Sequence, residues 1–174
     1  MTDSTMHTER FTLRPLRAGD EQALFPTMSD EAQCLYLSRP AFTSPEELWG
    51  WLAAPDWPGR TWIAEDGEGR VAGRFVAVPA HEDGVLEIGY ITCRERQGEG
   101  VARECTAALI EHLFARGIRK LIAEVDVENA PSIRLLERLG FTREALFREH
   151  ETTHKGLCDV AVYGLLASDS RPSK

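Results

Sequence analysis

The sequence predicts a single α/β domain built around one mixed sheet, and three observations carry this prediction. The chain has 174 residues, which is enough for one domain with a substantial core. Segments whose apolar residues alternate at every second position recur between segments with the helical spacing of three and four. There is no internal repeat and no long linker, and only the two ends, residues 1–9 and 168–174, look frayed.

The first half of the chain is expected to form a strand, two helices and a hairpin. FTLRPL alternates apolar and polar residues, as a strand with one buried face does. Asp20 begins a short helical stretch, and Ser44 followed by Pro45 is typical of a helix start. A DGEG turn between two β-rich runs predicts a hairpin. The expected segments are 11–16, 20–28, 44–53, 61–65 and 71–78.

The second half is expected to alternate strands and helices and to close with a second hairpin. The apolar positions of the long helix step by three and four, and Gly117 ends it. The next helix has Pro131 at its start and Gly140 just past its end. Lys155 and Gly156 form the turn of the closing hairpin. The expected segments are 85–92, 98–116, 120–128, 130–139, 141–153 and 157–166. This order gives a sheet of about six to seven strands flanked by about four helices.

Charge and cysteine usage exclude several classes of function. The formal net charge is −8, which argues against nucleic acid or an anionic membrane as the main partner. The chain has no run of about 18 apolar residues and its N-terminus has no apolar secretory segment, so no membrane span or secretion signal is expected. The cysteines Cys34, Cys93, Cys105 and Cys158 are scattered, which indicates reduced thiols and a cytoplasmic location.

The stretch HETTH at 150–154 matches the H-E-x-x-H pattern of zinc proteases, which requires a helix. Here two β-branched threonines fill the motif and a turn follows, so a strand is expected. In a strand His150 and His154 would lie roughly 13 Å apart, too far to share one zinc ion. A third ligand is also missing downstream. We therefore reject a metalloprotease and expect no metal site.

A stronger signal is the strand, basic loop and Gly-x-Gly that precede the long helix at residues 88–104. Gly98 and Gly100 allow the backbone to approach a ligand, and a helix N-terminus favours a pyrophosphate. Arg94 and Arg96 can add phosphate contacts. The stretch matches neither a P-loop nor a dinucleotide fingerprint, and an ordinary glycine turn remains the alternative.

This stretch resembles the phosphate-binding segment of the GNAT N-acetyltransferases, whose pattern is Q/R-x-x-G-x-G/A, although Glu95 occupies the first position. ENAPSIRLLERLGF at 128–141 is similar to the second acetyl-CoA segment of the RimJ/RimL-like branch, which acetylates ribosomal-protein N-termini. The strands FTLRPL and DVAVYGLL also resemble that branch. The resemblance covers about residues 9–166, within a single domain of residues 1–174.

The resemblance implies a GNAT fold, mostly antiparallel, in which the strand at 85–92 splays from the strand at 120–127. Acetyl-CoA would be the cosubstrate, with no metal, and its pantetheine arm would pair with backbone groups in the gap. Asn129 would bind the pantetheine or acetyl region. The residues implied in cofactor binding are Ile91, Cys93, Arg94, Arg96, Gln97, Gly98, Glu99, Gly100, Val101, Ala102, Asn129 and Ser132.

The resemblance also implies catalytic residues. Many family members protonate the leaving thiolate with a tyrosine, and Leu136 stands at that position here. The RimL-like pattern uses a serine, and Ser132 matches it, although this serine is also a natural first-turn residue of a helix. Glu151 matches the general base of that branch. Glu87 on the splayed strand is the second candidate, with a plain solvent-facing glutamate as its alternative.

The acceptor is expected to be a primary amine, most plausibly the α-amino group of a protein or peptide. An amine with a pKa near 8 is about 10% deprotonated at pH 7, whereas a lysine is about 0.04% deprotonated, so a glutamate base suits the α-amine. A small-molecule amine such as a polyamine or an antibiotic is the alternative, and a non-catalytic acetyl-CoA-binding module is the alternative of another class. Segment 20–57 should select the acceptor, with Tyr36, Arg39 and Glu87 as substrate-binding candidates. A homodimer is compatible with the resemblance.

Overall fold

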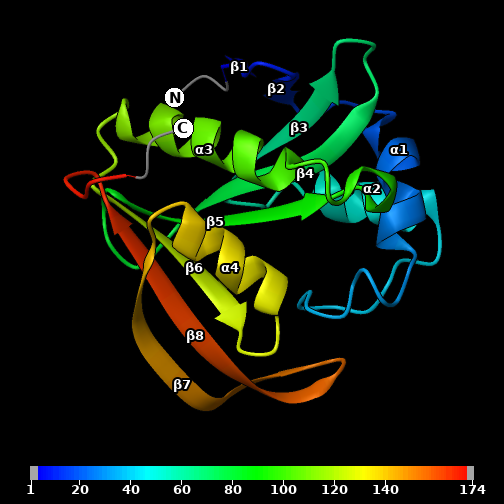
Figure 1. Cartoon of the computed structure of the whole chain (residues 1–174). Helices are drawn as coiled ribbons and strands as arrows, with labels where there is room; N and C mark the ends of the chain where they lie inside the picture. The colour runs from blue at the N-terminus through cyan, green and yellow to red at the C-terminus, as the bar shows by residue number, and fades with distance from the viewer. Residues whose placement is uncertain (1–3, 172–174) are drawn as a thin grey trace.

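The computed structural model describes residues 4–171, which form one eight-stranded sheet with helices on both faces (Figure 1). The strand order is β1-β2-β3-β4-β5-β6-β8-β7. The strands are β1 (Met6–His7), β2 (Phe11–Pro15), β3 (Arg60–Asp66), β4 (Val71–Pro79), β5 (Val85–Thr92), β6 (Lys120–Asp126), β7 (Thr142–Thr153) and β8 (Gly156–Leu166). The helices are α1 (Asp20–Met28), α2 (Pro45–Leu52), the 3₁₀ turn η1 (Arg94–Arg96), α3 (Val101–Phe114) and α4 (Ala130–Arg138). The predicted order of elements is confirmed, with one strand added.

The added strand is β1, in a segment that was expected to be frayed. Met6 pairs with Leu13 and His7 with Thr12, and the Met6 side chain is buried against the core. A two-residue strand is too short to show a period, so its existence depends on the edge of β2 and not on a local pattern.

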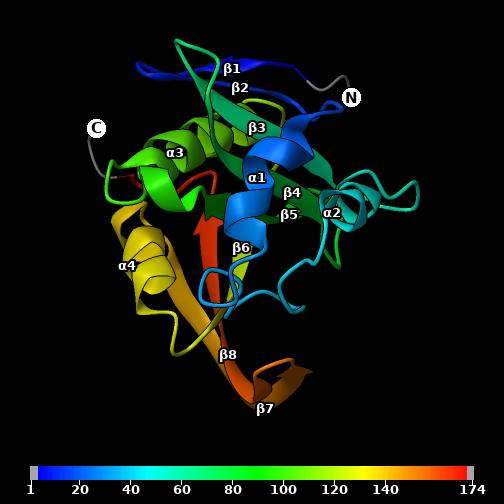
Figure 2. The same cartoon turned by 90° about the vertical axis from the view of Figure 1, so that its right-hand side faces the viewer.

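Two separate apolar cores fill the two sides of the sheet. The larger core packs beneath α3 and α4 and contains Phe75, Leu109 and Leu121. The smaller core lies on the side of α1 and α2 and contains Leu24 and Leu48. Figure 2 shows α3 and α4 together on one side of the sheet, with α2 on the other. Each strand residue therefore faces either the α3/α4 side or the α1/α2 side.

The only parallel neighbours in the described sheet, β5 and β6, separate after a short pairing. Their register runs from Val85 opposite Lys120 to Glu87 opposite Ile122, and no further pairs form. Beyond that point the two strands diverge, as Figure 1 shows. β4 still pairs with β5 from Leu86 to Thr92, and β8 with all of β6, so each strand bordering the gap is held from its outer side.

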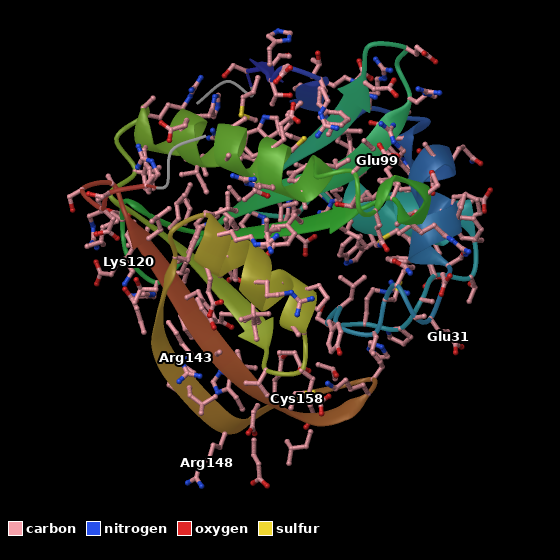
Figure 3. All side chains as sticks on the ribbon, in the orientation of Figure 1. Glu31, Glu99, Lys120, Arg143, Arg148 and Cys158 are labelled. Atoms are coloured by element: carbon pink, nitrogen blue, oxygen red, sulfur yellow. The ribbon has the colours of Figure 1, made fainter. Side chains whose placement is uncertain are left out.

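The closing hairpin carries a bulge in β7. Phe147 pairs with Val160, but the next pair along the ladder is Glu151 with Cys158, so β7 has two extra residues there. Glu149 adopts a positive φ of 49°, and its N–H donates to Asp159 Oδ1 at 2.7 Å. Figure 3 shows Arg148 pointing outward from this bend. The regular alternation of side chains along a strand is therefore interrupted at 148–150.

Because an even number of residues is inserted, Phe147 and Glu151 face the same side of the sheet. Cys158 and Val160, their partners, are two residues apart and so face the same side of β8. Val160 in turn pairs with Asp126 of β6, which faces away from the larger core. Glu151 therefore points to the α1/α2 side of the gap.

Candidate active site

The start of α3 offers unpaired backbone donors beside the gap. Gly98 and Gly100 both have φ of 81°, a left-handed conformation that a side chain would strain. Gly100 is the N-cap, and no side chain caps the helix there. The first intrahelical bond runs from the Glu104 N–H to the Gly100 carbonyl. The earlier amides, including those of Val101 and Ala102, are therefore available to an anion such as a pyrophosphate.

The neighbouring arginines are already held by carboxylates. Arg96 Nη1 contacts Asp66 Oδ2 at 3.0 Å and Arg96 Nε contacts Glu99 Oε2 at 2.9 Å. Arg94 Nη1 lies 2.9 Å from Asp30 Oδ2. These partners hold the two guanidinium groups in place and partly neutralise them. In the same loop Gln97 Nε2 donates to Gln33 Oε1 at 2.5 Å, and Figure 3 shows Glu99 beside the start of α3. The helix amides are thus the main phosphate donors that this geometry offers.

Ile91 and Cys93 were expected to bind the pantetheine arm in the gap, but the register of β5 directs their backbone groups elsewhere. The Cys93 N–H donates to the Ala72 carbonyl on the β4 side at 2.9 Å. In an antiparallel ladder, residues two apart direct their backbone groups to the same neighbour, so the groups of Ile91 also face β4. The backbone groups that face the gap belong to the intervening residues, Tyr90 and Thr92. A pantetheine arm in the gap would pair with those residues.

On the α3/α4 side of the gap, Tyr90 and Ser132 form a hydroxyl pair. The two oxygens lie 2.7 Å apart, and burial raises the pKa of Tyr90 to about 12. Asn129 is the N-cap of α4, and its Oδ1 accepts from the Ser132 N–H at 3.2 Å. Leu136 is fully buried in the larger core. The sequence-based reading missed Tyr90, although strand alternation from Glu87 places its side chain on the opposite face.

On the α1/α2 side of the gap, three carboxylates gather around the point of separation. Glu87 is half-buried on β5, and its pKa is raised by burial and by the negative charges of Glu124 and Glu151. Glu124 lies on β6 between the core residues Ala123 and Val125, so its side chain faces the other side of the sheet, the α1/α2 side. Strands β5, β6 and β7 therefore each direct one acidic side chain to the same place, which suits a cationic amine.

A cleft with a volume of about 330 Å³ joins the two sides of this gap. Tyr36 lies in its wall, and the Tyr36 hydroxyl donates to the Glu128 carbonyl at 3.1 Å. Arg39 is not in the wall, because its Nη2 binds Glu47 Oε1 at 2.5 Å and its guanidinium covers Phe42. The lining includes residues that were predicted from the sequence as site residues, among them Glu87, Asn129, Ser132 and Glu151. It also includes Tyr90, Trp51, Arg74, Val76 and Glu124, which were not predicted for the site.

HETTH lies in β7 and the turn after it, as predicted, and not in a helix. The His150 ring stacks on Phe147 with the ring centres 4.9 Å apart. Within residues 4–171, no group of three or more His, Cys, Asp or Glu side chains is arranged to hold a metal ion. No helix in this described part of the chain is both long and apolar enough to cross a membrane.

Known proteins share this fold, and a curated relative shares about a third of the aligned residues. The model of the acetyltransferase (GNAT) domain matches residues 10–142. An uncharacterized N-acetyltransferase p20 of Bacillus licheniformis is 32% identical over 171 residues, covering 93% of this chain and 96% of that protein. A spermidine N-acetyltransferase from Vibrio cholerae, solved with CoA and spermine, has a TM-score of 0.79 at 23% identity over 91% of this chain and 96% of that one. RimJ of Mycobacterium smegmatis, solved with CoA-disulfide, has a TM-score of 0.82 at 20% identity over 95% and 88% of the two chains.

The fold and the gap between β5 and β6 define an acyltransferase. The chain belongs to the GNAT family of acetyltransferases.

Proposed function

We propose that the protein transfers the acetyl group of acetyl-CoA to the α-amino group of a protein or peptide, as the RimJ/RimL-like branch does. One observation carries the proposal. One cleft is lined from both sides of the sheet. The hydroxyl pair Tyr90–Ser132 lies on the α3/α4 side, and the carboxylates of Glu87 and Glu151 lie on the α1/α2 side. An acyl donor and an amine can therefore meet in the gap from the two sides of the sheet.

Two observations favour Glu87 as the general base. Its side chain is half-buried, and its pKa is raised above the ordinary glutamate range, which brings it closer to the pH at which a base works efficiently. Glu151 is exposed, and its charge helps to raise the pKa of Glu87. We therefore propose that Glu87 accepts the amine proton, while Glu151 and Glu124 attract the ammonium form. Glu151 as the base is the alternative.

The hydroxyl pair is proposed to serve the leaving group. The Tyr90 hydroxyl stays protonated at neutral pH because burial raises its pKa to about 12. It can donate a hydrogen bond or a proton to the departing thiolate of CoA, with solvent restoring that proton, and the Ser132 hydroxyl holds it in place through their hydrogen bond. Ser132 alone was expected in this role.

A polyamine is the second candidate acceptor. The observation in its favour is the convergence of Glu87, Glu124 and Glu151, since several carboxylates suit a substrate with several positive charges. The spermidine N-acetyltransferase with a similar fold is consistent with that class. An antibiotic amine would depend on the same carboxylates. A non-catalytic acetyl-CoA-binding module is the alternative of another class, and the retained base and hydroxyl pair argue against it.

We also propose a cytoplasmic location and a homodimer. All four cysteines are free and buried, which suits a reducing cytoplasm.

A homodimer would use the edge strand β7, where Leu146 and Phe147 are exposed. Sedimentation of the purified protein at several concentrations tests the dimer.

The experiment that tests the function is release of free CoA thiol from acetyl-CoA in the presence of three acceptor panels: peptides with free N-termini, polyamines and aminoglycosides. We expect turnover with the peptides and none with N-terminally blocked copies of them. Turnover confined to polyamines or aminoglycosides would contradict the peptide α-amine as the acceptor and would identify a small-molecule amine in its place. Tight acetyl-CoA binding without turnover on any panel would favour the binding module.

A further inference from the structure

Arg74 of β4 is a buried cation without a carboxylate partner. Its exposed fraction is 8%, and the only influence that changes its pKa, to about 10, is burial. Its Nε has no hydrogen-bond partner, and its Nη2 reaches only Thr61 Oγ1, at 3.4 Å. The guanidinium remains charged at neutral pH. Burying such a charge unpaired is costly, so a partner from outside the chain would stabilise it.

Arg14 shows how this protein satisfies a buried arginine that has a structural role. Arg14 is 9% exposed, almost the same as Arg74. Its two terminal nitrogens each donate to an Asp20 oxygen at 2.8 Å, and its Nε donates to Glu65 at 2.7 Å. The bidentate pair with Asp20 and the separate bond to Glu65 together leave no unmet donor at Nε. Arg74 lacks every one of these contacts.

Arg74 lines the same cleft as the proposed base. Its guanidinium carbon lies 4.6 Å from the Trp51 ring centre and 5.9 Å from the Trp57 ring centre, so aromatic rings partly surround it. Arg74 pairs with Ile91, which is on the same face of β5 as Glu87. The contact with Thr61 of β3 directs the side chain to the level of Val76 and Gly89, two residues along β5 from Glu87, and toward the edge of β4 that faces β3. The separation from Glu87 is therefore about 7 Å along the strands, and the strand spacing of about 4.8 Å adds to it across the sheet.

We propose that Arg74 binds a carboxylate of the acceptor, so that the substrate carries an amine at one end and a carboxylate several atoms away. The inference rests on the proposed function and narrows its substrate class. An ammonium near Glu87 and a carboxylate on Arg74 complement the two charges of the cleft. The spacing is too long for a free α-amino acid and fits a short peptide or an ω-amino acid. A polyamine would place positive charge near Arg74, which is unfavourable.

The test compares matched acceptors that differ in one charge. Triglycine and triglycinamide offer an α-amine with and without a terminal carboxylate, and 6-aminohexanoate and 6-aminohexanamide do the same for an ω-amine. Gly-Glu-Gly-amide and Gly-Gln-Gly-amide place the carboxylate on a side chain. Binding is measured by calorimetry on the protein saturated with CoA, and kcat/KM is measured separately with acetyl-CoA.

In the wild-type protein we expect the carboxylate member of at least one pair to bind 10-fold or more tightly than its neutral partner, about 1.4 kcal/mol. The pair that shows this preference identifies the source of the carboxylate. Arg74→Met should abolish the preference, and Arg74→Lys should keep part of it. Equal binding within all three pairs, or a preference that survives Arg74→Met, overturns the inference. Calorimetry separates this failure from a failure of the proposed function, because it needs no acetyl transfer.

Thermal unfolding adds a readout that a purely structural role would move in the opposite direction. Arg74→Met removes an unpaired buried charge, so it should melt at the same temperature as wild type or higher. Arg14→Met removes one member of a paired network and should melt at a clearly lower temperature. Loss of stability in Arg74→Met comparable to that of Arg14→Met would make Arg74 a structural residue.

Discussion

The Tyr90 hydroxyl of β5 lies 2.7 Å from the Ser132 hydroxyl in the first turn of α4, and this contact spans the α3/α4 side of the gap. The two residues are far apart in sequence, because α3 and β6 lie between β5 and α4 along the chain. Asn129 fixes the position of Ser132 by capping α4, so the serine cannot drift from the tyrosine without loss of the cap.

Tyr90→Phe should therefore lower kcat by about 10²–10⁴-fold, because the variant keeps the ring but loses the proton donor. Acetyl-CoA affinity should change little. Ser132→Ala should give a smaller loss, and the double variant should be no slower than Tyr90→Phe if the two hydroxyls act as one unit. Steady-state kinetics with acetyl-CoA and the best acceptor measure all three. Near-normal kcat in Tyr90→Phe would remove this residue from the mechanism.

The pH dependence of kcat/KM distinguishes the two candidate bases. Glu87 has a raised pKa, so the deprotonated, active form should appear only above the ordinary glutamate range, and activity should rise with pH. Glu151→Gln removes a neighbouring negative charge, which should lower the pKa of Glu87 and shift the acid limb to lower pH. Glu87→Gln should abolish that limb and most of the activity. The reverse result, with activity lost only in Glu151→Gln, would make Glu151 the base.

Gly100→Val should weaken acetyl-CoA binding by 10-fold or more, about 1.4 kcal/mol. The φ of 81° strains a β-branched residue, and the start of α3 would have to shift away from the phosphate position. Calorimetry of the folded variant measures the effect. Gly117→Val is the matched control, since Gly117 has a φ of 85° at the other end of the same helix. An equal loss of affinity in the control would attribute the effect to general strain.

Purified, tag-free protein should contain no stoichiometric zinc by elemental analysis. The reason is geometric, because β7 extends the chain through His150 and the turn places His154 beyond its end. Acetyl transfer should persist in chelator. One zinc ion per chain that disappears in His150→Ala would contradict this reading.

The elements were predictable because each has its own local pattern, whereas several site residues depend on pairing across the sheet. The Gly98-x-Gly100 turn and Ser132 could be found from motifs. The direction of the Ile91 backbone could not, because it is set by register with β4. The same is true of Arg74, which looks like an ordinary strand arginine until its neighbours fail to supply a carboxylate. The β7 bulge likewise has no marker in HETTH, since it arises where Asp159 of β8 binds the Glu149 amide.

The sheet separates the α3/α4 side of the protein from the α1/α2 side, and the gap between β5 and β6 connects these two sides. An acyl donor that lies along the α3/α4 side leaves the carboxylate side free, so neither substrate has to depart before the other arrives. We therefore expect direct transfer within a ternary complex, with no acylated side chain as an intermediate. Cys93, directly after β5, is consistent with that route, because its thiol is buried at 1% exposure and burial raises its pKa to about 11. Initial-rate lines for the two substrates should intersect, as in a sequential mechanism, and not run parallel.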